Sequence, residues 1–138
     1  MFTSHNRVGR LVELRIGTPL TRDEIDDLVQ QQLINIARIP GKYVSVVDLR
    51  PSNVFPPAIA EQLIGLMTQG NPKLERSAFL LPESAILGLQ AERAVQEGGG
   101  DQRRVLRDPR ELEAWLGEVL GSAELQRLRE FLNEHLLG

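Results

Sequence analysis

The chain has 138 residues, of which 41% are hydrophobic and 25% are charged, and its net charge at pH 7 is −3. This length and composition predict a single folded domain over residues 1–138 and exclude a largely disordered chain. The absence of cysteine excludes disulfides, thiolate metal ligands and a cysteine nucleophile, and the acidic balance with few aromatic residues argues against nucleic acid as a partner.

The apolar runs of the sequence are much shorter than a membrane span. The first residues also lack the apolar core of a secretory signal. We therefore expect a soluble, cytoplasmic protein without a membrane partner.

Short apolar or β-branched segments predict five strands, at residues 2–7, 11–16, 43–49, 77–81 and 103–106. The first two segments are expected to form a hairpin. The second alternates in polarity, which predicts a half-buried strand with Glu13 and Arg15 on its polar face. The third is almost continuously apolar, which is typical of a central strand buried on both faces.

Helical spacing of apolar residues predicts five helices, at residues 21–38, 58–69, 82–97, 108–120 and 123–137. Thr21 and Glu24 have the spacing of a capping box. Asp108 is followed by a proline, the usual order at a helix start, and Ser122 is the expected N-cap of the last helix. Strands that alternate with helices predict an α/β fold with a mixed, mostly parallel sheet and right-handed crossovers.

This pattern resembles the STAS domains, the fold of bacterial anti-sigma-factor antagonists. It is most similar to the divergent STAS-like proteins that share a superfamily with the lipid-binding CRAL-TRIO domains. The resemblance covers nearly the whole chain and rests on the opening hairpin, the strand ending in Val46-Val47-Asp48-Leu49 and the strand-cap-helix segment at residues 104–116. It implies a four- to five-stranded sheet with packed helices and an extra C-terminal helix, used for protein contacts or small ligands rather than for catalysis.

The best-known antagonists carry a phosphorylated Ser or Thr where the loop after this strand meets the next helix. Pro57 and Ala58 stand at that place here, and Ser52 lies too early in the loop. The phosphorylation switch implied by the resemblance is therefore not expected in this chain.

The same loop supplies the candidate binding residues. Asp48 lies at the carboxyl end of the predicted central strand, where open α/β sheets bind their ligands. Arg50, Ser52 and Asn53 follow it and are suited to hold a phosphate or carboxylate. Phe55 belongs to an apolar stretch that is suited to a partner-facing patch. The structural alternatives are that Asp48 caps the loop or forms an ion pair there, and that residues 50–53 form an ordinary turn.

Other catalytic and ligand-binding arrangements fit the sequence poorly. A response-regulator receiver needs further acidic magnesium ligands and a lysine after the late strand, where Arg107 stands. His5 and His135 lie at opposite ends of the chain and do not make a catalytic triad or a zinc site. The glycines at 98–100 lack the lysine of a phosphate-binding loop. We predict no catalytic residues, metal or cofactor.

Two surfaces remain open to interpretation. Four arginines form the one basic cluster: Arg103, Arg104, Arg107 and Arg110. The acids between them favour local ion pairs over binding of an acidic protein or a phosphate. The last helix has an apolar face, which we interpret as core packing; because the earlier helices are expected to cover the sheet, a homodimer through this helix is the alternative.

These features favour a non-enzymatic regulatory or protein-interaction module whose partner is another protein. The alternative is a carrier or sensor of an apolar small molecule or lipid, held between the sheet and the helices. A small enzyme fits least, because no nucleophile–base pair or metal spacing is present.

Overall fold

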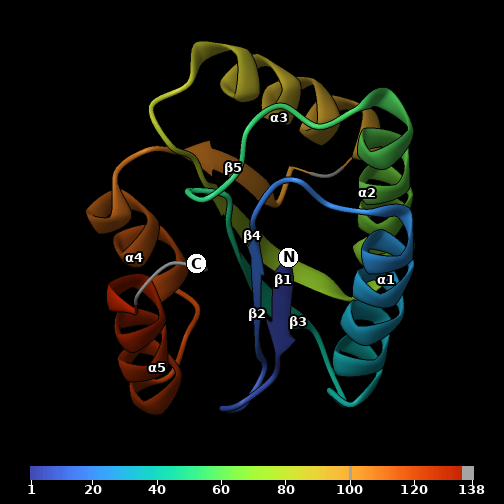
Figure 1. The fold of residues 1–138 in the computed structure, drawn as a ribbon. Coiled ribbons are helices and arrows are strands. Elements are labelled where there is room, and N and C mark those ends of the chain that lie inside the picture. The colour runs from blue at the N-terminus through green and yellow to red at the C-terminus, as the bar shows by residue number, and fades with distance from the viewer. Residues whose placement is uncertain (100, 135–138) are drawn as a thin grey trace.

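The computed structural model describes residues 1–99 and 101–134 (Figure 1). Its sheet has the strand order β1-β2-β3-β4-β5. The first strand is antiparallel to the second, and the other pairs are parallel. This arrangement confirms the predicted mixed sheet with an opening hairpin. The strands are β1 (Phe2–His5), β2 (Leu11–Ile16), β3 (Tyr43–Asp48), β4 (Leu74–Leu80) and β5 (Arg103–Leu106).

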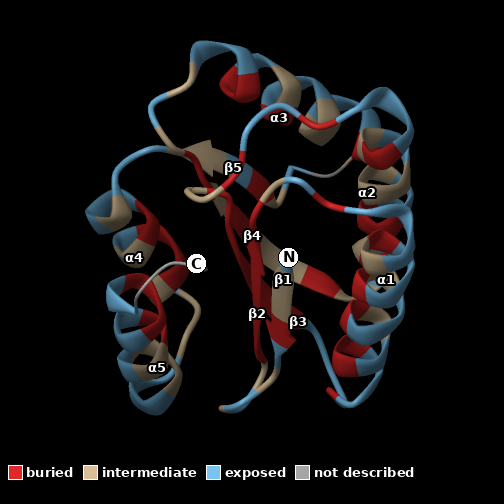
Figure 2. Ribbon diagram, in the orientation of Figure 1, coloured by how far each residue is buried: buried red, intermediate tan, exposed pale blue. Residues whose placement is uncertain are grey.

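Helices cover both sides of this sheet. They are α1 (Arg22–Ala37), α2 (Pro57–Gly70), the short 3-10 helix η1 (Asn71–Lys73), α3 (Ala85–Gly98), α4 (Pro109–Gly117) and α5 (Ser122–Asn133). Figure 1 shows α1, α2 and α3 on one side, which we call the α1–α3 face, and α4 and α5 on the other, the α4–α5 face. Each side has its own cluster of buried apolar residues, and the sheet between them is buried along most of its length (Figure 2).

Two of the predicted helix starts are confirmed. Thr21 Oγ1 accepts the N–H of Glu24 at 3.1 Å, and the Glu24 carboxylate accepts the N–H of Thr21 at 3.1 Å, which completes the capping box. The Asp108 carboxylate accepts the N–H of Arg110 at 2.9 Å, with Pro109 as the first helical residue.

Other predicted boundaries are wrong. The third helix begins at Ala85, because the Ser84 hydroxyl caps it by accepting the N–H of Leu87 at 3.2 Å. The last helix is preceded by Gly121 as N-cap instead of Ser122, because the Glu124 carboxylate accepts the Gly121 N–H at 2.8 Å.

Three further ends of strands and helices differ from prediction. The fourth strand begins at Leu74 instead of residue 77, because Leu74 is buried and both Leu74 and Arg76 pair with β3. The fourth helix ends at Gly117 rather than at residue 120. The last helix ends at Asn133 instead of residue 137, because the backbone of Glu134 is extended; His135 lies outside the described residues.

The largest correction concerns β2. Its predicted polar face is buried, with Glu13 at 1% and Arg15 at 3% exposure. The reason is that α1, α2 and α3 cover only one side of the sheet, so α5 is needed on the other and lies over these two residues. The apolar residues of α5 accordingly pack in the core, with Leu128 fully buried.

None of the helices among the described residues is long and apolar enough to cross a lipid bilayer.

Candidate functional site

Asp48, the first predicted site residue, is fully buried on the α4–α5 face. Arg15 Nε donates to its Oδ2 at 2.8 Å, and Arg50 Nε donates to its Oδ1 at 2.9 Å. Burial alone would raise the pKa of the Asp48 carboxyl, but the hydrogen bonds from Arg50 and Arg15 outweigh it and lower the pKa below its ordinary value. Asp48 is therefore ion-paired within the fold, which is the structural role given above as the alternative to ligand binding.

The two arginines extend from Asp48 to α5. Arg15 Nη2 donates to the backbone carbonyl of Phe131 at 2.6 Å, and its guanidinium lies 4.1 Å from the centre of that ring. Arg50 Nη2 donates to the carbonyl of Leu132 at 3.0 Å. These contacts satisfy carbonyls near the C-terminal end of α5 with positive charge.

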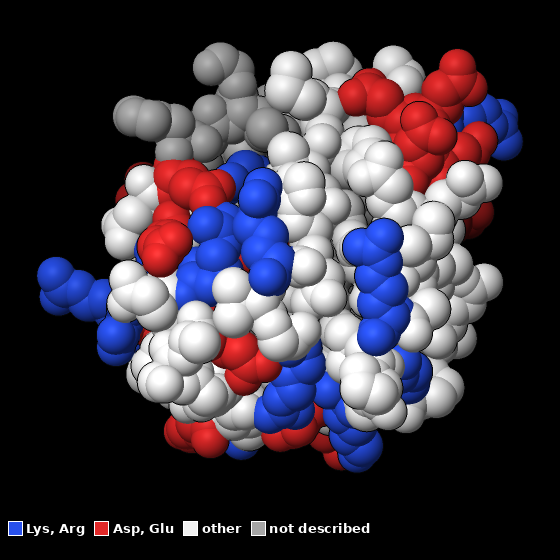
Figure 3. Space-filling model, turned by 90° about the horizontal axis from the view of Figure 1, so that it is seen from below, with Lys and Arg blue, Asp and Glu red and all other residues white. Residues whose placement is uncertain are grey.

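A second set of ion pairs joins the same helix to β2. Arg127 Nε and Nη2 donate to the two oxygens of Glu13 at 2.9 and 2.8 Å, a bidentate pair. Arg127 also pairs with Glu134. We call the whole group the ion-pair network; it comprises Glu13, Arg15, Asp48, Arg50, Arg127 and Glu134. Figure 3 shows acidic and basic side chains next to one another on the surface as well.

The remaining predicted site residues do not join this network. The Ser52 hydroxyl is buried and donates to the carbonyl of Ile16 at 2.5 Å. Asn53 is exposed, and its backbone N–H donates to Thr18 Oγ1 at 2.8 Å.

Phe55 was expected in an exposed apolar patch, but it is buried. It faces the α1–α3 side of the sheet, because its backbone is held to α3: Gln90 Oε1 accepts the Phe55 N–H at 2.9 Å, and Gln90 Nε2 donates to the Phe55 carbonyl at 2.8 Å. Asp48 and Arg50 lie on the opposite side. The structure therefore does not bring the five predicted residues together into one site.

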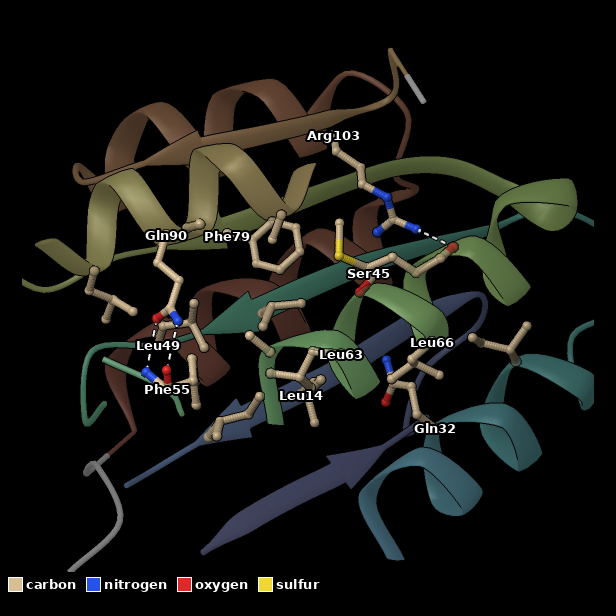
Figure 4. Close-up of a pocket in the computed structure, with 18 of the residues that line it drawn as sticks. Leu14, Gln32, Ser45, Leu49, Phe55, Leu63, Leu66, Phe79, Gln90 and Arg103 are labelled. Atoms are coloured by element: carbon tan, nitrogen blue, oxygen red, sulfur yellow. Dashed lines mark hydrogen bonds between the residues drawn. The ribbon is translucent and has the colours of Figure 1, made fainter. Parts of the chain in front are cut away.

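A cavity of about 80 Å³ lies on the α1–α3 face, between the sheet and the three helices (Figure 4). Leu14 and Phe79 form part of its floor, and Leu63 and Leu66 of α2 cover it. Small side chains on the helices, Ala91 among them, leave this space unfilled. The lining is therefore almost entirely apolar, as expected of a pocket for an apolar ligand.

One end of this cavity is polar. Ser45 on β3 pairs in register with Ser77 on β4, which pairs with Arg103 on β5. Because paired residues of neighbouring strands point to the same side of a sheet, these three side chains form a row across the α1–α3 face. We call them the polar row. Ser45 and Arg103 line the cavity, and Ser77 lies between them, fully buried.

The polar row is incompletely hydrogen-bonded. Ser77 Oγ and Arg103 Nε are buried without a hydrogen-bond partner among the described residues. Arg103 Nη2 donates to the carbonyl of Met67 and to Asn71 Oδ1, both at 2.9 Å, near the end of α2 (Figure 4). Burial lowers the pKa of the Arg103 guanidinium, and burial raises the pKa of the neighbouring Tyr43 phenol.

Among the residues that the structure describes, the arginines of the basic cluster do not form the predicted ion pairs with the acids between them. Within residues 1–99 and 101–134, Arg103 has no acidic partner and is directed inward. Arg104, its neighbour on the same strand, lies over the Trp115 ring at 4.6 Å. Arg107 donates to the carbonyl of Ser84 at 3.5 Å. Successive side chains of a strand point to opposite sides of the sheet, so Arg103 and Arg104 face different sides.

Sequence reasoning missed the polar row, although a signal was available. Ser45 interrupts a run of buried β-branched residues, and Ser77 precedes an apolar strand segment. A polar residue at an inward-facing position of a central strand is unusual and needs a partner. Identifying that partner requires the register, which no local pattern supplies.

Three of the molecule's large apolar side chains are exposed beside the cavity-forming helices. They are Val54, Ile86 and Leu89, at 45%, 68% and 73% exposure. They lie along a surface groove between α2 and α3. The described residues contain no group of three or more histidine or acidic side chains that could hold a metal ion.

Comparison with known proteins adds one result. No protein-family model matches the chain, and no curated protein matches its sequence. Among solved structures, the fold is similar to that of an uncharacterized protein from Shewanella loihica PV-4, described as a DUF3478-family protein with a SpoIIAA-like fold. The match has a TM-score of 0.65 and covers 83% of this chain and 93% of that chain, at 14% identity. At this identity it shows the fold alone, and the STAS-like fold predicted from the sequence is confirmed.

Proposed function

We propose that this STAS-like domain is a non-catalytic binding module that holds a small apolar molecule between its sheet and helices α1, α2 and α3. The observation that supports this function is the cavity of about 80 Å³ with its apolar lining. An unfilled space inside a close-packed domain costs contacts with the missing neighbours. A ligand that fills the space would restore them.

The size of the cavity limits the ligand. An engineered cavity of about 150 Å³ binds benzene, so 80 Å³ suits a short aliphatic chain or part of a ring. A longer lipid tail would require α2 and α3 to separate. The loop at Phe55 and the side chain of Gln90 connect these two helices, so an occupied cavity would change the surface that they present. A sensor of a small molecule therefore fits better than a carrier of a whole lipid.

Native mass spectrometry of the freshly purified protein tests whether it retains a small molecule. Calorimetric titration with 1-butanol, 1-hexanol and 1-octanol tests the cavity itself. Because burial of one methylene contributes about 0.8 kcal/mol, affinity should rise roughly fourfold per methylene until the tail exceeds the cavity. No retained mass and no measurable binding of any alcohol would contradict the proposal.

A matched pair of variants locates the binding. Ala91→Leu adds three carbons at the cavity wall and should abolish alcohol binding. Ala123→Leu makes the same change on the exposed surface of α5, on the opposite side of the molecule, and should leave binding unchanged. Equal binding by the two variants would place any alcohol site elsewhere.

A regulatory protein-interaction module is the second candidate, favoured by the exposed apolar side chains of Val54, Ile86 and Leu89. These side chains lie along the groove between α2 and α3. Pull-down from native cells should lose its partner with Ile86→Ser or with Leu89→Ser. A partner captured equally by all three proteins would contradict this surface.

A further inference from the structure

The polar row is an unusual feature in a cavity whose lining is mostly apolar. Its three side chains offer two hydroxyl groups and one guanidinium on adjacent strands: Ser45, Ser77 and Arg103. Two of their polar atoms, Ser77 Oγ and Arg103 Nε, are buried and have no hydrogen-bond partner in the part of the chain that the structure describes. Buried polar groups in folded proteins are normally hydrogen-bonded, so these two indicate that something is missing from the site.

Charge indicates what is missing. Arg103 is only 9% exposed. Its partners, the Met67 carbonyl and Asn71 Oδ1, are neutral acceptors, and no carboxylate pairs with it among the described residues. A buried cation without an anion is strongly unfavourable, whereas guanidinium binds carboxylates with geometric specificity.

Position indicates the shape of the ligand. Arg103 and Ser45 line the same cavity as Leu14 and Leu63, which are apolar (Figure 4). A molecule in this space would have its polar end near β5 and its apolar part between the sheet and α2. An uncharged apolar ligand would leave Arg103 unpaired.

We propose that the polar row binds the carboxylate of a small amphipathic acid, such as a short-chain fatty acid, with Arg103 as the ion-pairing residue and the two serines as hydroxyl donors. This inference rests on the proposed function, since it concerns the same cavity. It specifies the class of ligand as an apolar monocarboxylate, which the apolar lining alone does not.

The methyl group of Met67 is a suitable probe. The chain has two methionines, and Met67 lines the cavity while Met1 is 53% exposed. With ¹³C-labelled methionine methyl groups, the full chain gives one signal from the cavity and one from the exterior. Titration with hexanoate and, separately, 1-hexanol at pH 7 compares ligands that share a chain length and differ in charge.

We expect both ligands to shift the Met67 signal, with hexanoate binding about tenfold or more tightly, because hydrogen bonds to charged groups are the stronger kind. Arg103→Leu should abolish the preference and leave hexanol binding in place. Arg104→Leu removes an equal charge from the other side of the same strand and should retain the preference. Ser77→Ala should reduce it by a smaller factor.

The possible failures are distinguishable. If wild-type protein binds hexanoate no more tightly than hexanol, the carboxylate assignment is overturned and the apolar cavity site stands. If neither ligand moves the Met67 signal, the proposed function fails together with the inference. Should Arg103→Leu unfold, Arg103→Lys keeps the positive charge, and a retained preference for hexanoate in that variant supports the assignment while its loss overturns it.

Discussion

The two faces of the sheet differ in how completely their polar groups are satisfied. On the α4–α5 face, Glu13, Arg15 and Asp48 are as buried as core leucines, and each has a partner of opposite charge. On the α1–α3 face, a buried arginine and a buried serine each have an atom without a hydrogen-bond partner among residues 1–99 and 101–134, beside an unfilled cavity. The first arrangement fixes a helix in place, whereas the second leaves room and hydrogen-bonding capacity for a ligand.

The comparison shows that buried charge does not by itself identify a functional site. Asp48 stands where α/β sheets bind ligands, but Arg15 and Arg50 already occupy both of its oxygens. Arg103 stands on a short edge strand and lacks such a partner. The informative property is the unsatisfied atom, which marks the face where something can still bind.

The largest effect is expected from breaking the ion-pair network. Asp48→Asn removes the buried carboxylate that pairs with Arg15 and Arg50 and leaves Arg15 with only the more exposed Glu134, so it should lower the free energy of unfolding by about 3–5 kcal/mol. Glu118→Gln, which removes the partner of Arg76 at the surface, should cost about 0–1 kcal/mol. Urea denaturation of both variants measures the difference. Equal small losses would show that the network does not hold α5.

The apolar residues of the two faces should also differ. Leu128→Ala opens a new cavity in the filled α4–α5 face and should cost about 3–5 kcal/mol. Leu66→Ala enlarges a cavity whose wall already lacks some contacts, so its cost should lie near the low end, about 2–3 kcal/mol. Thermal unfolding of the two variants measures both losses of stability. A larger loss for Leu66→Ala than for Leu128→Ala would contradict the expected order.

Acid should destabilise the α4–α5 face. The pKa of Asp48 is below its ordinary value of about 3.9, because hydrogen bonds from Arg50 and Arg15 outweigh the effect of burial. Ionised Asp48 therefore stabilises the fold above its unfolded-state pKa, and this stability is lost as the pH falls through the lower folded-state pKa. Stability measured from pH 6 to pH 2 should fall less steeply for Asp48→Asn than for the wild type. Parallel curves would contradict this role.

The smallest contrast uses two buried serines. Ser52→Ala removes a hydroxyl that donates to the Ile16 carbonyl and should cost about 1 kcal/mol. Ser77→Ala removes a hydroxyl that has no partner among the described residues, and it should cost nothing or stabilise slightly. Chemical denaturation of the unliganded proteins tests the difference, and a greater loss for Ser77→Ala would mean that its hydroxyl is satisfied in the native protein.

Local signals made much of the fold predictable. The capping pair Thr21 and Glu24, the Asp108-Pro109 step and the alternation of strands with amphipathic helices each depend on neighbours in sequence. The burial of Glu13 was not predictable in this way, because its partner Arg127 is 114 positions further along the chain.

The site was less predictable than the fold for the same reason. Asp48, Arg50 and Phe55 are close in sequence but lie on different sides of the sheet. Asp48 and Arg50 pair on the α4–α5 face, whereas the hydrogen bonds to Gln90 hold Phe55 on the α1–α3 face. Ser45 and Arg103 are far apart in sequence. They lie in one row across the sheet because each pairs with Ser77 on the strand between them. A cavity depends on how whole helices pack, and no short pattern records it.

Methyl NMR of the leucine and valine side chains during titration with 1-hexanol tests the central claim most directly. We predict shifts in Leu14, Leu63 and Leu66, which line the cavity, with Leu112 and Leu128 on the other side of the sheet unchanged. Shifts confined to Leu112 and Leu128, or none in either group at saturating alcohol, would contradict a ligand site on the α1–α3 face.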